Sequence, residues 1–399
     1  MFKKSLLAVA VLGTAAGFAC AADVTLYGVA DAGLIYTNTK TTHTDPAKAT
    51  EKEHSFGLES GVSSGSRFGL KGTEDLGNGL KVGFKLENGF NTDDGTLGNN
   101  GRLFGREASL TVSGDFGALS MGRMGGVGSA AGTYNLFTVT ADAFDGGNNE
   151  INGLINTGRY DNMITYQTPK FAGVQATFQY SFKGDNTAND DAAKKGFYDP
   201  STGREGSAAT DRYASMGLTG DFGALQTVLT YEYINYASNG TYEKNGVELH
   251  GYNKDGLNGQ IISLGGNYDC GFAKTFVAAQ YFKDVLDSDE SFYHAQRNVF
   301  NSMEGYALAL GTIVPVAGGD MTVAYYYRDA DIDSNPQDAA SFKKEEEKYH
   351  GLTAKYEYPL SKRTSLYTGA GWSQDKFKSD ANTEKETIYQ AFAGMTHRF

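Results

Sequence analysis

Apolar and polar side chains alternate along short segments of this chain. The clearest case is residues 80–87, LKVGFKLE, in which every second residue is apolar. The side chains of a β-strand point to its two faces in turn, so this segment presents one face to hydrocarbon and the other to water. The pattern therefore predicts β-strands with one lipid-facing side.

The alternation recurs in sixteen segments, joined in turn by short turns containing Gly, Asn or Pro and by long polar loops. An even number of strands, with short turns at one end, long loops at the other and both termini at the short-turn end, is typical of a membrane barrel. The sequence predicts an all-β fold, a 16-stranded antiparallel transmembrane β-barrel, and at this size an aqueous channel remains inside. The segments are 24–37, two around the turn at 75–79, 102–113, 118–124, 159–168, 174–182, 212–219, 224–236, 260–268, 273–283, 303–314, 320–328, 349–358, 364–374 and 387–399.

One loop, about residues 125–158, differs from the others. It contains Asp142, Asp145 and Glu150 but no Lys or Arg, and several aromatic and aliphatic residues. A loop of this length is usually functional or disordered, and its apolar content disfavours disorder. We expect it to fold inward and pack inside the barrel.

The N-terminus reads as a targeting signal. Lys3 and Lys4 precede an apolar run, and Ala19-Cys20-Ala21 has the small-x-small pattern of a cleavage site. We expect residues 1–21 to be a signal peptide and residues 22–399 to form one domain. Removal of two lysines would change the formal charge from -12 to -14, which argues against nucleic acid as a partner.

Catalytic and metal sites are not indicated. The six histidines lack metal-ligand spacing, and no Ser, His and acid arrangement suggests a nucleophile. Residues 126–131 formally fit a dinucleotide fingerprint, but no amphipathic helix follows them. We therefore expect no enzyme activity, cofactor or metal.

Four motifs occur in order along the chain: VTLYGVADAGL at 24–34, SRFGLKGTEDLGNGLK at 66–81, GDFGALSMGR at 114–123 and AFAGMTHRF at 391–399. With these motifs, the mature chain resembles the general diffusion porins of the Gram-negative outer membrane. The resemblance implies a homotrimer of barrels in contact with outer-membrane lipid and lipopolysaccharide. Each barrel would hold a pore for passive diffusion of small hydrophilic solutes and ions, and Phe399 would act as the C-terminal assembly signal.

The resemblance also implies a constriction, with basic residues on the wall facing acids on the third loop. By position, the basic residues are Arg67, Arg106, Arg159 and Arg123, and the acids are Asp142, Asp145 and Glu150. Arg106 has the same parity as the apolar residues of 108–112, so it requires a bulge or a place at the rim. The Pro-Glu-Phe-Gly usual at the tip of this loop is replaced by residues 143–147, AFDGG.

Charge selectivity follows from the balance of charges around such an opening. Basic strand residues oppose an acidic loop and an acidic chain, and the sequence as a whole favours cations. The alternatives to a general pore are a substrate-selective channel and a surface adhesin built on a barrel.

Overall fold

The computed structural model describes residues 24–129, 132–140, 151–184, 211–236, 241–244, 247–250, 258–286, 301–334, 343–379 and 382–399. Within these residues nearly all regular structure is β-strand, and no helix is long and apolar enough to cross a membrane. The strands are β1 (Thr25–His43), β2 (Glu51–Ser60), β3 (Arg67–Gly77), β4 (Leu80–Gly89), β5 (Glu107–Gly114), β6 (Gly117–Gly125), β7 (Arg159–Gln167), β8 (Val174–Ser181), β9 (Arg212–Phe222), β10 (Leu225–Asn235), β11 (Thr241–Lys244), β12 (Val247–His250), β13 (Asn258–Asp269), β14 (Lys274–Leu286), β15 (Asn301–Val316), β16 (Gly319–Ser334), β17 (Lys343–Pro359), β18 (Thr364–Lys378) and β19 (Thr383–Arg398); the short helices are α2 (Gly98–Gly101) and η2 (Phe137–Val139).

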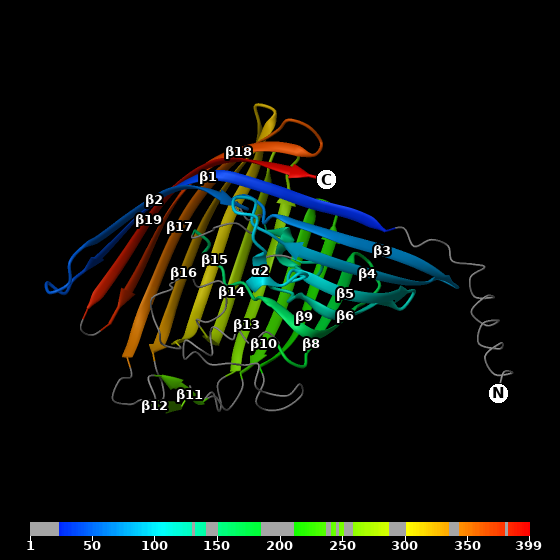
Figure 1. The fold of residues 1–399 in the computed structure, drawn as a ribbon, viewed down its shortest axis with the longest axis horizontal. Coiled ribbons are helices and arrows are strands. Elements are labelled where there is room, and N and C mark those ends of the chain that lie inside the picture. The colour runs from blue at the N-terminus through cyan, green and yellow to red at the C-terminus, as the bar shows by residue number, and fades with distance from the viewer. Residues whose placement is uncertain are drawn as a thin grey trace, which may run out of the picture.

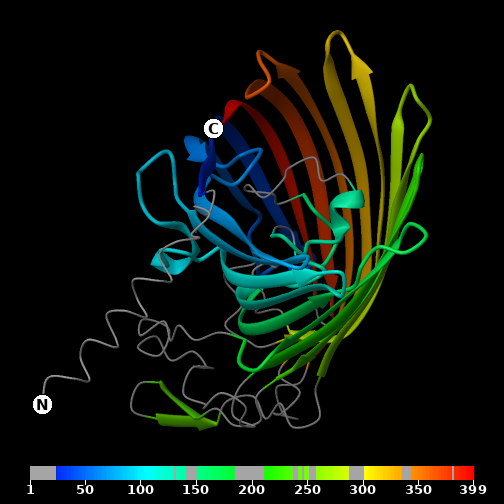
Figure 2. The same ribbon diagram turned by 90° about the vertical axis from the view of Figure 1, so that its right-hand side faces the viewer.

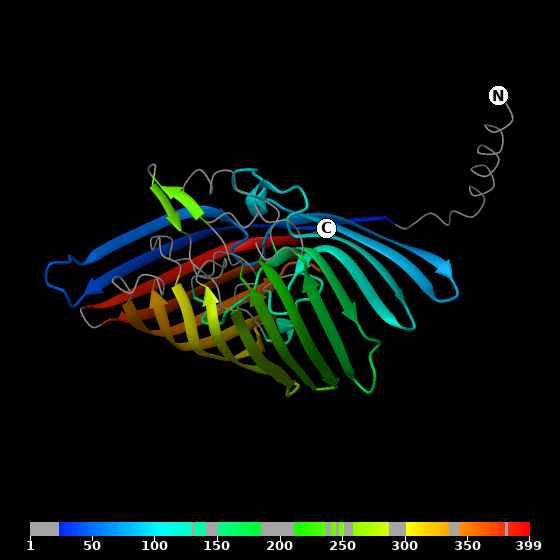
Figure 3. The same ribbon diagram turned by 90° about the horizontal axis from the view of Figure 1, so that it is seen from below.

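The main sheet closes on itself through β1 (Figure 1). One edge of β1 pairs with β19, and its other edge pairs with β3 and then with β2. Because β2 and β3 pair with successive parts of the same edge of β1, they occupy a single strand position in the wall. The seventeen strands of the main sheet therefore fill sixteen positions (17 − 1). Every pairing between the described strands is antiparallel, and β11 and β12 form a separate two-stranded sheet (Figure 3).

The short connections contain residues suited to tight turns. Between β3 and β4, Gly77, Asn78 and Gly79 have φ values of 81°, 52° and 78°, a left-handed conformation that Gly and Asn adopt most readily. The turn is closed by the Gly77 amide, which donates to the carboxylate of Asp75 at 2.8 Å. The predicted turn at 75–79 is thereby confirmed.

The two faces of the wall differ in polarity, as predicted. In β19 the apolar residues Tyr389 and Met395 are exposed, whereas the alternate residues Gln390 and Thr396 are buried. Tyr306, Leu308 and Leu310 of β15 are likewise exposed. Since these large apolar side chains point away from the enclosed side, they form the face that contacts lipid.

Two segments differ from the sequence prediction. None of the sixteen predicted segments covers residues 38–63, which are mostly polar, yet β1 extends to His43 and β2 occupies Glu51–Ser60. Charged and polar residues surround Phe56 and Leu58 and hide the alternation there, although both side chains are exposed on the outer face. The strand expected at 102–113 begins only at Glu107, because the chain makes a further turn at residues 103–104 after α2.

Candidate pore constriction

The loop of residues 126–158 leaves the end of β6 and returns to the start of β7. Its described residues contact buried, inward-pointing side chains of the wall, and Figure 2 shows η2 within the ring of strands. The contacts fall into two groups, one on β4–β6 close to the start of the loop and the other on β9–β17.

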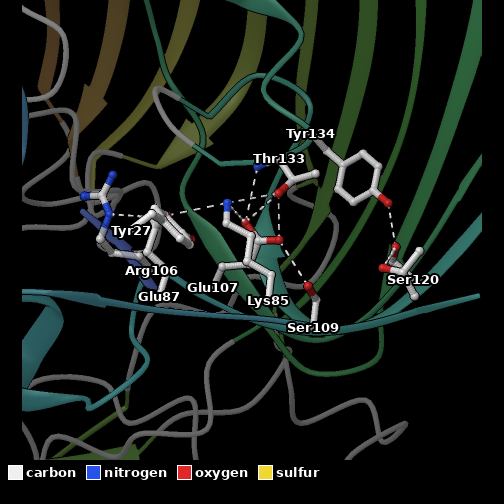
Figure 4. Close-up of polar contacts among 10 residues, drawn as sticks. Tyr27, Lys85, Glu87, Arg106, Glu107, Ser109, Ser120, Thr133 and Tyr134 are labelled. Carbon is white, nitrogen blue, oxygen red and sulfur yellow. Dashed lines mark hydrogen bonds and ion pairs between the residues drawn. The ribbon is translucent and has the colours of Figure 1, made fainter. Parts of the chain in front are cut away.

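Glu107 at the start of β5 fixes the loop to the near wall (Figure 4). The Thr133 hydroxyl donates to its carboxylate at 2.7 Å, and the Thr133 amide donates at 3.3 Å. Lys85 Nζ on β4 lies 2.8 Å from Oε2 of Glu107, and Ser109 donates at 3.1 Å. Glu107 is only 1% exposed, so these protein groups, and not water, surround its carboxylate.

A second contact lies one strand further on. The hydroxyls of Tyr134 and Ser120 are 2.5 Å apart, and Ser120 is also hydrogen-bonded to Thr111 at 2.6 Å (Figure 4). Burial raises the pKa of the Tyr134 phenol, which therefore stays neutral at ordinary pH. Thr133 and Tyr134 together hold the first part of the loop against β5 and β6.

Glu87 on β4 organises the basic residues beside Glu107. Arg106 Nε lies 2.8 Å from Glu87 Oε1, Tyr27 donates to Glu87 Oε2 at 2.8 Å, and Lys85 Nζ is 3.5 Å away. Arg106 lies just before β5, and its backbone amide donates to the Glu87 carbonyl at 3.2 Å. Because Arg106 lies outside β5, its side chain need not point to the same face as the apolar residues of 108–112. This resolves the conflict between its position and its expected place in the pore.

Asp161 on β7 binds a second group of basic residues, Arg102 and Arg123. Arg102 donates to both carboxylate oxygens of Asp161, at 2.8 and 3.0 Å, and Arg123 Nη1 donates at 2.8 Å. Arg123 also lies 3.4 Å from the carbonyl oxygen of Arg159. The β6–β7 register shifts between Gly122 and Met124, where Gly122 has a φ of 135°, and this irregularity accompanies the inward contacts of Arg123.

Glu232 on β10 holds residues from both the start and the end of the loop. Its carboxylate accepts hydrogen bonds from Thr157 and Tyr213 at 2.5 Å each and from the Gly128 amide at 3.4 Å. The Tyr213 hydroxyl also accepts from the Val127 amide at 3.2 Å. A Cβ at Gly128 would lie 2.0 Å from Glu232 Oε1, so only glycine fits there without displacement.

Other contacts extend the anchoring across the barrel. Gln280 on β14 exchanges two hydrogen bonds with the backbone of Ile155, at 2.7 and 2.9 Å. Arg328 on β16 donates to the carbonyl oxygen of Gly153 at 3.2 Å. Leu136 and Phe137 pack in one apolar cluster with wall residues of β10 and β14–β17. The loop thus contacts strands on both sides of its starting point.

The predicted basic residues fall into two neighbouring groups. Arg67 begins β3, next to the β4 residue Gly89, and donates to the Gly65 carbonyl at 2.9 Å; Arg106 lies beside Glu87. Arg123 and Arg159 lie together on β6 and β7. The predicted acids Asp142, Asp145 and Glu150 lie outside the described residues.

Phe399 lies at the seam of the barrel. Its backbone amide and carbonyl exchange hydrogen bonds with Gly28 on β1 at 3.0 and 2.9 Å. A Cβ on Gly28 would lie 2.3 Å from the Phe399 ring. The final residue therefore takes part in closing the barrel.

Sequence reasoning missed the carboxylates that pair with the arginines. Five residues belong to these groups but were not selected: Lys85, Glu87, Arg102, Glu107 and Asp161. The alternation of residues 80–87 placed Lys85 and Glu87 on the water face. Nothing in one sequence tells at which height along the barrel they meet the arginines. In the part of the chain that the structure describes, no three His, Cys, Asp or Glu side chains are grouped as metal ligands.

Comparisons with known proteins agree with this architecture. A family model described as Gram-negative porin matches residues 8–378. An outer membrane porin protein of Bordetella pertussis is 31% identical over 425 aligned positions covering 100% of both chains, and outer membrane porin protein 32 of Delftia acidovorans is 29% identical, covering 97% of this chain and 94% of that protein. The solved anion-selective porin from Comamonas acidovorans has a TM-score of 0.60 and 26% identity, covering 95% of this chain and 100% of its own. The chain therefore belongs to the Gram-negative porins of the outer membrane, and its barrel forms a pore for passive diffusion.

Proposed function

We propose that the pore is narrowed where residues 126–158 cross it, and that Arg67, Arg106, Arg123 and Arg159 form the basic side of this constriction. Asp142, Asp145 and Glu150 would form the acidic side. The observation that carries the proposal is the anchoring of the loop at both ends to inward-facing carboxylates, Glu107 and Glu232. A loop held in this way limits the size of solutes that pass.

The mechanism requires no chemical step. Fixed charges of opposite sign across a narrow, water-filled opening create a transverse field, which orders water and aligns polar solutes. Apolar solutes lose hydration there without compensation. Small hydrophilic solutes and ions would pass, consistent with relatives that are named as porins rather than enzymes.

We further propose that the constriction prefers anions. The predicted arginines and the charged residues grouped with them around Glu87 and Asp161 comprise six basic residues and three carboxylates, a formal balance of +3 (6 − 3). The three loop acids would at most cancel this charge, and the similar Comamonas porin is named as anion-selective. The cation preference favoured by the sequence rests on those loop acids and on whole-chain charge. The six basic residues are Arg67, Lys85, Arg102, Arg106, Arg123 and Arg159, and the carboxylates are Glu87, Glu107 and Asp161.

The biological unit would be a homotrimer in contact with outer-membrane lipid and lipopolysaccharide. Support for this assembly comes from the porin family as a whole. Chemical cross-linking of the protein in intact outer membranes would test it, with a ladder ending at three chains as the expected result.

Liposome swelling tests the diffusion function. Neutral sugars of increasing size should enter at rates that fall smoothly with size and rise linearly with concentration. Saturation by one solute at millimolar concentration would instead support a substrate-selective channel. Absence of flux through correctly folded protein would favour the adhesin alternative.

A further inference from the structure

A short segment, residues 61–66, separates β2 from β3, and we call it the β2–β3 segment. On β1, Ala32 is paired with Ser60 at the end of β2, and Val29 is paired with Arg67 at the start of β3. Two residues of β1 therefore stand opposite six residues of the neighbouring position, an excess of four (6 − 2). These extra residues cannot take part in the strand pairing and must leave the wall.

The β2–β3 segment leaves the wall towards the pore. Val62 is 1% exposed and packs with Ile35, Tyr367 and Phe392. These three side chains alternate with exposed apolar residues on β1, β18 and β19, so they point away from the lipid. The barrel therefore contains a second inward segment besides residues 126–158.

Asp31 on β1 binds this segment along its whole length. The Gly61 amide donates to the Asp31 carbonyl at 3.0 Å, and the Ser63 amide donates to the Asp31 carboxylate at 3.2 Å. The Ser66 hydroxyl accepts from the Asp31 amide at 3.1 Å and donates to the Asp31 carbonyl at 3.0 Å. One residue thus holds the beginning, the middle and the end of the segment.

The Asp31 carboxylate is in turn fixed by the wall. Asp31 is fully buried, the Tyr367 hydroxyl donates to its Oδ1 at 2.9 Å, and the Thr396 hydroxyl donates to its Oδ2. From β17, Lys355 Nζ donates to the hydroxyl of Ser63 at 3.0 Å. Hydrogen bonds to a charged group are stronger than those between neutral groups, so the segment is held firmly against β1 and β17–β19.

Arg67 directly follows the segment and depends on it. Its Nη1 donates to the carbonyl oxygen of Gly65 at 2.9 Å. An arginine side chain has many rotamers, and a fixed acceptor restricts it to a few of them. Since Asp31 fixes the segment and the segment offers this acceptor, Asp31 determines where the charge of Arg67 lies.

We propose that Asp31 is a positioning residue for ion selectivity, which acts by holding Arg67 at the pore constriction through residues 61–66. This inference rests on the basic constriction proposed above. A carboxylate that acted by its own charge would favour cations, whereas one that positions Arg67 favours anions. The two roles of Asp31 therefore predict opposite effects of its removal.

Reversal potentials of the purified protein in planar bilayers under a KCl gradient test the proposal. Asp31→Ala should lower the Cl⁻/K⁺ permeability ratio by up to about fourfold, the factor for one unit charge about 5 Å away, although it removes a negative charge. Ser66→Ala changes no charge and should lower the ratio in the same direction, and it tests the proposal even where Asp31→Ala does not assemble. The matched control Thr396→Val removes a donor to the same carboxylate from β19 and should leave the ratio unchanged.

The same measurement with Arg67→Gln shows whether Asp31 acts through the arginine. Combined with Arg67→Gln, neither Asp31→Ala nor Ser66→Ala should lower the ratio further. Equal lowering with and without Arg67, equal lowering by Thr396→Val, or an unchanged or higher ratio in both Asp31→Ala and Ser66→Ala would overturn the proposal. An unchanged ratio in Arg67→Gln alone would instead remove Arg67 from the basic constriction, and the inference would fall with it.

Discussion

Arg106 Nε lies 2.8 Å from Oε1 of Glu87, so an arginine of the proposed constriction is paired with a carboxylate of the wall itself. Glu107 and Asp161 provide two further wall carboxylates for Lys85, Arg102 and Arg123. The wall charges are therefore partly compensated before the loop contributes any charge. This arrangement holds the basic side chains in fixed positions, and it moderates their attraction for anions.

Glu87→Gln should shift the ion selectivity of the pore towards anions. A unit charge about 5 Å from an ion in water contributes about 0.8 kcal/mol, or a factor of about four in local concentration. We expect the Cl⁻/K⁺ permeability ratio, measured from the reversal potential in a salt gradient, to rise by up to that factor. Asp221→Asn removes the same charge at an exposed short turn and should leave the ratio unchanged. An equal shift in both variants would contradict the role of Glu87.

Thr133→Val should loosen the near end of the loop. The variant loses the hydroxyl that donates to Glu107 at 2.7 Å, and a hydrogen bond to a charged group contributes about 1.5–3 kcal/mol. We expect larger open-channel current noise in single-channel recordings. The same substitution at the exposed Thr138 on this loop is the control, and quiet currents from Thr133→Val would argue against the Glu107 anchor.

Tyr213→Phe should loosen the attachment of the loop to β9 and β10. The ring and its stacking on Tyr160, with centroids 4.0 Å apart, are retained, while the hydroxyl that links Glu232 to the Val127 amide is lost. A loss of about 1.5–3 kcal/mol in local stability corresponds to amide exchange roughly ten- to hundredfold faster at Val127 and Gly128. Tyr180→Phe on the outer face should not change that exchange. Unchanged protection of these amides in Tyr213→Phe would show that the link through Glu232 does not hold the loop.

Gly128→Ala should displace the loop by steric conflict. The added Cβ would lie 2.0 Å from Glu232 Oε1, and such overpacking costs about 1–3 kcal/mol. We expect the barrel to fold and its single-channel conductance to change. Gly158→Ala is a matched control on the same loop, because its Cβ would meet no atom within 4 Å. Identical conductance in Gly128→Ala and wild type would show that this contact does not set the pore width.

The barrel itself could be predicted because lipid imposes a simple rule on each strand. Every second residue must be apolar, and the rule is visible wherever a strand crosses hydrocarbon, as in residues 80–87. Beyond the hydrocarbon layer the rule no longer applies. For this reason β2, whose Phe56 and Leu58 are surrounded by charged and polar residues, was missed.

The site was predictable only in part. Motif positions placed the four arginines near one another, and the structure pairs Arg106 with Glu87 and Arg123 with Asp161. The acid partners were missed because alternation gives the face of a residue but not its height along the barrel. Register between strands, and the turn that takes Arg106 out of β5, depend on pairing across the sheet, which one sequence does not reveal.

The reversal potential of single channels in a planar bilayer under a KCl gradient tests the central claim most directly. We predict a stable open current with Cl⁻ preferred over K⁺, and a loss of that preference when Arg67 and Arg106 are both replaced by Gln. A wild-type preference for K⁺, or a Cl⁻ preference that survives the double replacement, would contradict the proposal that these wall arginines set the selectivity of the pore.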